Sequence, residues 1–331
     1  MITLGIETSC DDSSVGIYCD ERKGLANVAA NQLVHEKYGG VVPELASRSH
    51  LRNLPPVMRA ALAEANLSLG DIDHLAVTQG PGLMGSLMVG VSFAMGLASA
   101  QNLPVMGVHH IEAHILANHL ERDMLFPSLV LVVSGGHSQI ILARRPGDYR
   151  LLASTRDDAA GEAFDKVAKI MGLGYPGGPI IEKMAKDGDA KAFKFPKVRL
   201  KGGGLDYSFS GLKTAARLLW EAEGSPEKIA DFAASFQKAV VDQLLGRCLE
   251  VARGRSLEAF YLAGGVAANR ALLGAAEERL GALDLAVFAP SPKYCTDNGL
   301  MVACAASFRR KEKSSASEAL KPFSRGNLAA P

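Results

Sequence analysis

No charged residue occurs between positions 80 and 108, and about 20 consecutive apolar residues are enough to span a bilayer. Glycine and serine interrupt this stretch repeatedly, and a Gly-Pro-Gly turn opens it. Residues 75–78 before the turn and 104–108 after the helical part have the composition of strands. Strand, glycine-rich turn, apolar helix and strand make a βαβ unit whose helix lies on a sheet. We therefore expect a buried helix at residues 83–100 rather than a membrane span.

The composition indicates a folded chain of two domains or two lobes. The 331 residues include 36 Lys+Arg and 35 Asp+Glu, and 48% are hydrophobic, which excludes a disordered chain. The net charge of +1 argues against coating nucleic acid through bulk charge. Five scattered cysteines without a CxxC pair suit a reducing compartment, and no signal peptide is recognisable. We expect a cytoplasmic protein.

Strand and helix patterns alternate along the whole chain, which predicts an α/β fold. Residues 2–6 and 15–18 read as a hairpin across a polar loop, and residues 129–133 and 139–143 as a second hairpin across Ser134–Ser138. Two such hairpins suggest a duplicated lobe. Further strands are expected near 25–31, 259–263 and 285–289. Helices are expected from Pro43 with an interruption at Pro55-Pro56, and at 110–121, 158–171, 179–186, 212–221, 227–253, 269–280 and 297–310.

Five of the eight histidines fall between positions 109 and 137. His110 and His114 have i, i+4 spacing, which places both on one face of a helix, as in many metal sites. The same spacing also arises by chance or in a surface pair. A third ligand must come from elsewhere, and Asp297 is a candidate, although it can equally cap the last helix.

A zinc peptidase is excluded by the position of the nearby glutamate. The H-E-x-x-H motif places its glutamate next to the first histidine. Here Glu112 lies two residues after His110, about 200° around the helix. Glu112 therefore cannot act on water bound at the same ion.

Three glycine-rich turns are candidate nucleotide contacts. Ser134-Gly135-Gly136-His137 lies between strands, where bare N–H groups can hold a phosphate. Residues 264–269 follow a strand and open a helix, with Asn269 as a hydrogen-bond partner for an adenosine. Residues 175–179 lie between Asp165 and Glu182, whose carboxylates suit ribose hydroxyls. Each turn alone can be no more than tight-turn geometry, and the G-K-[ST] of a Walker motif is absent from the sequence.

Ten motifs in one order extend over nearly the whole chain. They are Gly5-Ile6-Glu7-Thr8-Ser9-Cys10-Asp11, Tyr38-Gly39-Gly40-Val41-Val42-Pro43-Glu44, Gly80-Pro81-Gly82-Leu83, His110-x-x-x-His114, Val133-Ser134-Gly135-Gly136-His137, Gly161-Glu162-Ala163-Phe164-Asp165-Lys166, Tyr175-Pro176-Gly177-Gly178-Pro179, Phe209-Ser210-Gly211-Leu212-Lys213, Ala263-Gly264-Gly265-Val266-Ala267-Ala268-Asn269 and Cys295-Thr296-Asp297-Asn298-Gly299. With these motifs the chain resembles the tRNA N6-adenosine threonylcarbamoyltransferase (TsaD) family, formerly known as O-sialoglycoprotein endopeptidases.

The resemblance implies an actin-like ATPase (ASKHA) fold, with two duplicated α/β lobes and a nucleotide cleft between them. Lobe I is then residues 1–125, completed by a C-terminal helix at about 297–325, and lobe II, which binds the adenylate, is residues 126–296. The implied reaction transfers a threonylcarbamoyl group from threonylcarbamoyl-AMP to N6 of adenosine 37, just 3′ of the anticodon, in tRNAs reading codons that begin with A. The product is t6A.

The resemblance also implies a set of site residues. An iron or zinc ion would be held by His110, His114 and Asp297. The adenylate would contact Val133, Ser134, Gly135, Gly136, His137, Asp165, Gly178, Glu182 and Asn269. Asp11 is our candidate for positioning or deprotonating the adenine amine; its alternative role is that of a turn-forming residue.

Two other functions stay open at this point. Sugar kinases with this architecture usually carry Asp-x-Gly-Thr in the first hairpin, whereas this chain has Glu7-Thr8-Ser9-Cys10-Asp11, so a small-molecule kinase is the weaker alternative. A non-catalytic scaffold subunit is the other. The family's partners are TsaB, expected to contact lobe I, the ATPase TsaE, and TsaC as the supplier of the adenylate. Helix 83–100 is expected to be core, or to place one face against TsaB.

One segment is strongly basic despite the neutral total. Residues 183–201 carry a net charge of +5, which leaves −4 for the rest of the chain. Phe193 and Phe195 lie among the lysines, a pattern that suits phosphate contacts and base stacking by tRNA. A solvated loop is the alternative. Arg309-Arg310-Lys311 is a second, weaker candidate. The segment's basic residues are Lys183, Lys186, Lys191, Lys194, Lys197, Arg199 and Lys201.

Overall fold

The first sheet is assembled around an N-terminal strand. As predicted, β1 (Ile2–Glu7) and β2 (Ser13–Cys19) form an antiparallel hairpin. β1 also pairs parallel with β4 (His74–Gly80), and β4 with β5 (Val105–His109). β3 (Lys23–Ala30) completes the strand order β3-β2-β1-β4-β5.

The computed structural model describes residues 1–20, 23–197, 204–309, 320–326 and 328. The chain divides into two compact units. Unit 1 comprises Met1–Met124, Pro146–Asp148 and Thr296–Pro331, and unit 2 comprises Leu125–Arg145 and Tyr149–Cys295.

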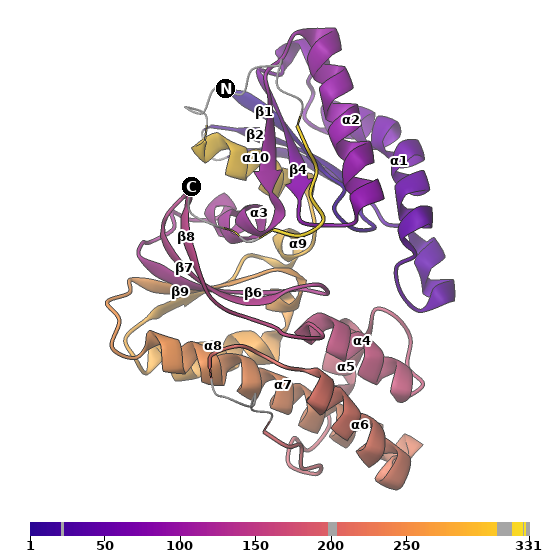
Figure 1. Cartoon of the computed structure of the whole chain (residues 1–331), viewed down its shortest axis with the longest axis vertical. Coiled ribbons are helices and arrows are strands. Elements are labelled where there is room, and N and C mark those ends of the chain that lie inside the picture. Colours follow the sequence, from indigo (N-terminus) through magenta and orange to yellow (C-terminus); the bar gives the residue numbers. More distant parts are fainter. Residues whose placement is uncertain (21–22, 198–203, 310–319, 327, 329–331) are drawn as a thin grey trace. The chain divides into compact units, whose positions relative to one another are not determined.

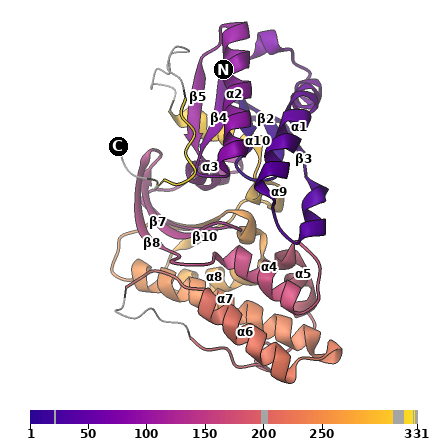
Figure 2. The same cartoon turned by 45° about the vertical axis from the view of Figure 1, so that its right-hand side comes forward.

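Helices cover both faces of the first sheet (Figure 1, Figure 2). α1 (Pro43–Glu64) and α2 (Met84–Gln101) pack on one face, where Leu4 and Ile6 of β1 join the apolar core. α10 (Gly299–Phe308) packs on the other face. A Cβ at Gly5 would lie only 2.2 Å from the carbonyl oxygen of Gly299, so this close approach requires glycine.

The predicted interruption at Pro55-Pro56 is wrong, because α1 continues through both prolines. A proline removes a backbone donor and normally breaks a helix. Here Leu54, Val57 and Met58 are buried against the sheet, and this packing keeps the helix intact.

α2 is buried on one face only. It is long and apolar enough to cross a membrane by length and composition, and a third of it is buried. Leu87, Val91 and Ala94 pack inward, whereas Met84 and Met88 are 42% and 54% exposed. The expectation of a core helix is therefore correct only for the face that packs inward.

Two predicted helices are shorter than expected. The histidine-rich helix α3 (His110–Leu116) gives way to a 3-10 turn, η3 (Ala117–Leu120). The C-terminal helix does not extend from about 297 to 325: α10 ends at Phe308, residues 310–319 lie outside the described residues, and residues 320–326 are not helical.

The second sheet repeats the strand order of the first. β6 (Ser128–Val133) forms the predicted hairpin with β7 (Ser138–Arg145) and pairs parallel with β9 (Ala259–Ala263), which pairs parallel with β10 (Ala286–Phe288). β8 (Asp148–Ser154), which the sequence analysis missed, completes the order β8-β7-β6-β9-β10. In both sheets a hairpin leads into strands parallel to its first member, as expected for a duplicated fold.

Helices of unit 2 lie along one face of this sheet (Figure 1, Figure 2). They enclose an apolar core with β6 and β9, in which Phe164, Phe236 and Phe260 are buried. The helices are α4 (Ala160–Ile170), α5 (Gly177–Ala185), α6 (Ser210–Glu223), α7 (Ile229–Ala252) and α8 (Arg270–Gly281). Besides η3, the short elements of the described chain are η1 (Leu33–Tyr38), η2 (Leu69–Asp71), η4 (Pro226–Lys228), η5 (Gly265–Ala268) and α9 (Pro292–Cys295).

Candidate metal centre and nucleotide-binding turns

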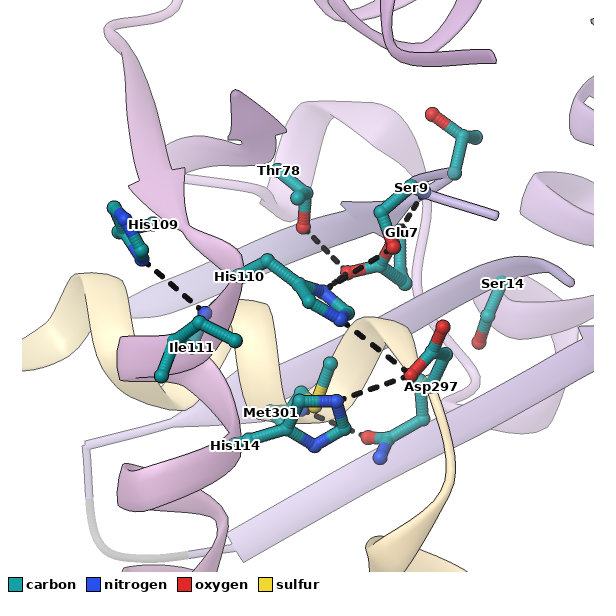
Figure 3. Close-up of polar contacts among 12 residues, drawn as sticks. Glu7, Ser9, Ser14, Thr78, His109, His110, Ile111, His114, Asp297 and Met301 are labelled. Carbon is teal, nitrogen blue, oxygen red and sulfur yellow. Dashed lines mark hydrogen bonds and ion pairs between the residues drawn. The ribbon is translucent and has the colours of Figure 1, made fainter. Parts of the chain in front are cut away.

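Three possible metal ligands meet in unit 1, as the sequence predicted (Figure 3). Asp297 Oδ1 lies 3.1 Å from His114 Nε2 and 3.7 Å from His110 Nε2. All three ligand atoms lie within 4.8 Å of one another. Both histidines are buried on the first turns of α3, which starts directly after β5. Two imidazole nitrogens and one carboxylate oxygen are a donor set that suits a divalent transition-metal ion.

Asp297 does not cap the last helix, which corrects one of its two expected roles. The cap is Asn298, whose Oδ1 accepts a hydrogen bond from the backbone N–H of Met301 at 2.9 Å. Because the neighbouring residue satisfies the helix end, the Asp297 carboxylate is turned toward the two histidines instead (Figure 3).

A buried carboxylate supports His110 from the side opposite Asp297. Glu7 Oε2 lies 3.1 Å from His110 Nδ1 and accepts a hydrogen bond of 2.6 Å from Thr78 Oγ1. Ser9 Oγ is 3.2 Å from the same ring nitrogen. Carboxylates in this position fix the orientation of metal-binding histidines. The sequence analysis gave Glu7 no role, although a charged residue ending an apolar strand was an available signal.

Charges around the three ligands are unbalanced without a cation. Burial alone would lower the pKa of His110, but Glu7 and Asp297 outweigh it and raise the pKa to about 9. Burial and the carboxylates of Asp297, Asp11 and Glu7 raise the pKa of Asp12 to about 7. Such a collection of acidic groups is stabilised by a bound cation, so the residues present fit a metal ion.

Asp11 lies half-buried in the loop between β1 and β2. Its charge acts on Asp12, as does that of Asp297, which places the Asp11 carboxylate in the same acidic surroundings as the metal ligands. The role of Asp11 in positioning or deprotonating the adenine amine stays a prediction.

The turn after β6 is held by its own backbone and by the start of α4. Ser134 N donates to His137 O at 2.8 Å, and Ser134 Oγ accepts from His137 N at 3.1 Å. Gly161 N donates to Ser134 O, where an added Cβ would lie 2.6 Å from that oxygen. Gly161 is thus required by packing. Val133, the last residue of β6, is fully buried.

At four other positions of unit 2, packing does not require a glycine. A Cβ added at Gly135, Gly136, Gly178 or Gly265 would meet no atom within 4 Å, and none of these four has a positive φ. Neither crowding nor backbone conformation therefore demands glycine there. A ligand can approach the open backbone closely at these positions.

The three predicted polar contacts of the nucleotide already bind backbone groups of unit 2. Asp165 Oδ1 accepts a hydrogen bond of 2.7 Å from Gly177 N, and Glu182 Oε1 one of 2.9 Å from Arg270 N. Asn269 caps α8 through its Oδ1 and donates from Nδ2 to Gln237 at 2.8 Å. These bonds place α4, α5 and α8 around the turns.

A polar hollow of about 230 Å³ adjoins these residues within unit 2. Its lining consists of Pro179, Glu182, Lys183, Lys186, Ala268 and Arg270. Glu182 comes from α5, whereas Ala268 and Arg270 come from the turn and helix that Asn269 connects. Two of the predicted nucleotide segments thus meet at one hollow.

The predicted base-stacking role is wrong for Phe193, whose ring is buried, and stays a prediction for Phe195, which is half-buried. The Phe193 ring packs edge-on against Phe232 with centroids 4.9 Å apart, and Phe195 packs against Phe232 and Phe236. Phe193 belongs to the unit 2 core and Phe195 packs against it, which removes apolar surface of both rings from water. Lys191, Lys194 and Lys197 are exposed. Arg199, Lys201, Arg310 and Lys311 lie outside the described residues.

Comparison with known proteins decides the family. Residues 23–304 match the family described as TsaD: tRNA N6-adenosine threonylcarbamoyltransferase. The chain belongs to this family. A protein of Syntrophotalea carbinolica named tRNA N6-adenosine threonylcarbamoyltransferase is 48% identical over 309 residues, 92% of this chain and 90% of the relative.

Solved structures agree on the fold. HypF of T. kodakarensis aligns with a TM-score of 0.63 at 15% identity, over 94% of this chain and 48% of that chain. Component A of (R)-2-hydroxyglutaryl-CoA dehydratase from Acidaminococcus fermentans aligns with a TM-score of 0.57 at 17% identity, over 94% and 100%. The chain therefore has the actin-like ATPase fold that its motifs implied.

Membership of the TsaD family makes this chain an enzyme, a transferase that acts in t6A-type modification of tRNA. The kinase and the non-catalytic scaffold, both open from the sequence, are set aside by the same finding. The family is consistent with a divalent metal ion and a nucleotide-type substrate, and the cluster of His110, His114 and Asp297 is a possible site for that ion.

Proposed function

We propose that this TsaD-family chain transfers the threonylcarbamoyl group of threonylcarbamoyl-AMP to N6 of adenosine 37 in tRNAs reading codons that begin with A. The observation that carries the proposal is the convergence of His110, His114 and Asp297, with Glu7 behind His110. The proposed ion is Fe²⁺, with Zn²⁺ as the other candidate. When bound, such an ion would neutralise phosphate charge and orient the carbonyl group of the adenylate.

The open turns of unit 2 supply the proposed adenylate site. Backbone N–H groups at Gly135 and Gly136 suit the phosphate, where charge collects as AMP leaves. Asp165, Glu182 and Asn269 border the proposed sites of the ribose and the base, together with the backbone at Gly178. The hollow beside Glu182 suits a nucleoside, since a base can lie against Pro179 and Ala268.

The chemistry requires an activated carbonyl group, because the exocyclic amine of adenine is a poor nucleophile. Attack by N6 on the carbamoyl carbon forms the new C–N bond, and the C–O bond to phosphate breaks with its electron pair leaving on AMP. N6 loses one proton in this step. We assign that proton to the carboxylate of Asp11, which would also position the amine.

Replacing Asp11 tests this assignment. Asp11→Ala should lower transfer by roughly 10²–10⁴-fold, the usual contribution of a general base. Binding of tRNA should not change. Full transfer by this variant, with normal tRNA binding, would remove Asp11 from the mechanism.

The exposed lysines of residues 191–197 are the proposed tRNA contact. Each lysine that no longer neutralises a phosphate should reduce the slope of log affinity against log salt by about 0.9 on duplex-like RNA. The double variant Lys194→Glu/Lys197→Glu should therefore bind tRNA less tightly and with a shallower slope. An unchanged slope would exclude this patch.

We also propose that TsaB binds the exposed faces of α1 and α2. Between them lies a hollow of about 490 Å³, with an apolar lining that includes Leu51, Met88 and Phe93. Leu51 is 64% exposed, and a contiguous apolar surface of this kind is typical of an interaction site. Met88→Asp should prevent copurification with TsaB; retained copurification would exclude this face. TsaE and TsaC are the further proposed partners, and the proposed compartment is the cytoplasm.

The proposed function is tested with purified protein, threonylcarbamoyl-AMP and unmodified tRNA, with and without a chelator and TsaB. Nucleoside mass spectrometry should detect t6A, and both chelation and His110→Ala should abolish it. His110→Ala should also lose bound metal. Full t6A formation by metal-free protein would contradict the proposed role of the cluster.

A further inference from the structure

A buried histidine outside the metal cluster joins α1 to the loop between β1 and β2. His50 is fully buried, and its Nδ1 lies 2.7 Å from Ser13 Oγ. Its Nε2 lies 2.9 Å from the carbonyl oxygen of Cys10, the residue directly before Asp11. Neither the family motifs nor the metal centre gives His50 a role.

The two hydrogen-bond partners, Cys10 and Ser13, determine which nitrogen of the His50 ring carries the hydrogen. A carbonyl oxygen can only accept, so Nε2 carries the hydrogen and donates to Cys10 O. Nδ1 is then unprotonated and accepts the hydrogen of the Ser13 hydroxyl. Burial lowers the pKa of His50, which keeps this neutral form in place. The ring is therefore a rigid connector rather than an acid or a base.

The N-terminal end of α2 restrains the same loop. Thr8 Oγ1 donates to Ser86 O at 3.0 Å, and Leu83 N donates to Ser9 O at 2.8 Å. Ser9 Oγ in turn lies 3.2 Å from Nδ1 of His110. The loop thus has one contact to a proposed metal ligand and carries the proposed base two residues later.

We propose that His50 is a positioning residue for threonylcarbamoyl transfer, because it fixes the Cys10 carbonyl and thereby the place of Asp11. The inference rests on the proposed function and extends it to a residue of α1. Without the bond from Nε2, Cys10 could rotate its peptide, and both Ser9 and Asp11 would lose their fixed positions. A displacement of about 1 Å at a reacting group can cost roughly 100-fold in rate.

Two substitutions distinguish the hydrogen bond of His50 to Cys10 from its hydrogen bond to Ser13. In His50→Gln, the side-chain amide can place an N–H near the position of Nε2 and keep the bond to Cys10. In His50→Asn, the shorter amide reaches the position of Nδ1, so it keeps the partner Ser13 and loses Cys10. Both variants remove the same aromatic ring from the same buried place.

His35 provides the matched control within unit 1. It is 1% exposed and also bonds through both nitrogens, to Gln32 Oε1 at 2.9 Å and from Val42 N at 3.3 Å. Neither partner belongs to the loop of residues 8–12. His35→Asn should therefore cost comparable stability without moving that loop.

The first measurement is hydrogen exchange of residues 8–12 by mass spectrometry, which requires no activity. His50→Asn should speed exchange in this segment, whereas His50→Gln and His35→Asn should leave it close to wild type. Equal exchange in all four proteins would overturn the positioning role even if the wild-type protein is active.

The second measurement is steady-state transfer by metal-loaded protein with TsaB present. His50→Asn should lower kcat by roughly 10–100-fold with KM for threonylcarbamoyl-AMP unchanged, and His50→Gln should restore most of kcat. If His50→Gln is as slow as His50→Asn, or if His35→Asn loses as much, the inference is wrong. Absence of transfer in wild type would instead contradict the proposed function, and hydrogen exchange would still decide the role of His50.

Discussion

The two units share one strand order but place different chemistry at the same point of it. β1 ends in Glu7 and continues into a loop of polar side chains, whereas β6 ends in the buried Val133 and continues into bare glycines. In unit 1 the candidate site is made of side chains that contact one another. In unit 2 the turn after β6 instead exposes backbone, since a Cβ added at Gly135 or Gly136 would meet no atom within 4 Å. Duplication of a fold thus leaves each copy free to present either side-chain or backbone groups.

This comparison predicts that a subtle change in unit 1 affects metal binding alone. Glu7→Gln keeps the shape of the side chain but removes the charge that faces His110. Loss of such an outer partner typically lowers metal affinity by about 10–100-fold. Competition titration with a chromogenic chelator measures the change, and nucleotide affinity should not change.

Glu44→Gln is the control, because Glu44 is exposed in the same unit and pairs only with Arg48 among the described residues. Metal affinity reduced equally in both variants would show that Glu7 has no special connection to the cluster.

Two glycine substitutions in unit 2 test the same comparison between the units. Gly136→Val adds a side chain where space is open, so the melting temperature should be kept while AMP affinity falls. Gly161→Ala adds a methyl group 2.6 Å from Ser134 O, so it should destabilise the protein by about 1–3 kcal/mol. Thermal unfolding and nucleotide titration distinguish the two.

Metal affinity should be unchanged in Gly136→Val. Normal AMP affinity in this variant would mean that the open turn is not a ligand site, and the proposed division between the units would fail.

The smallest expected effect concerns stability against pH in unit 2. Burial would raise the pKa of Asp158, but hydrogen bonds from Lys213 and Lys166 outweigh it and lower the pKa below its usual 3.8. A depressed pKa stabilises the fold at pH values above the ordinary one, and this stabilisation is lost as the pH falls through the folded value.

The melting temperature of Asp158→Asn should therefore be lower than that of wild type near neutral pH, with the difference closing in acid. The metal cluster of unit 1 should be unaffected. A difference between the two proteins that is constant from neutral to acidic pH would exclude this ionic contribution.

Much of this arrangement could be predicted from the sequence. The spacing of His110 and His114 and the hairpins of both units are local patterns that depend on few residues. Glu7 and His50 escaped prediction because their partners lie 103 and 40 positions away, at His110 and Cys10. The periodicity of apolar residues along the sequence does not indicate a contact between residues that are so far apart.

Local rules failed where tertiary packing decides the outcome. Pro55 and Pro56 predict a helix break, but burial of the surrounding face holds α1 together. In the sequence Phe193 lies among lysines and is predicted to stack on bases, but its ring packs against Phe232 in the core of unit 2. The residues adjacent in sequence do not reveal that α1 packs on a sheet or that the Phe193 ring is buried in a core.

A single-turnover experiment tests the central claim most directly. Metal-loaded protein with TsaB would be mixed with threonylcarbamoyl-AMP labelled in the carbamoyl carbon and an unmodified anticodon stem-loop RNA. The account predicts that label appears at N6 of the adenosine just 3′ of the anticodon, with one AMP released for each RNA modified and none after chelation. AMP release without label on the RNA, or undiminished labelling by metal-free protein, would contradict it.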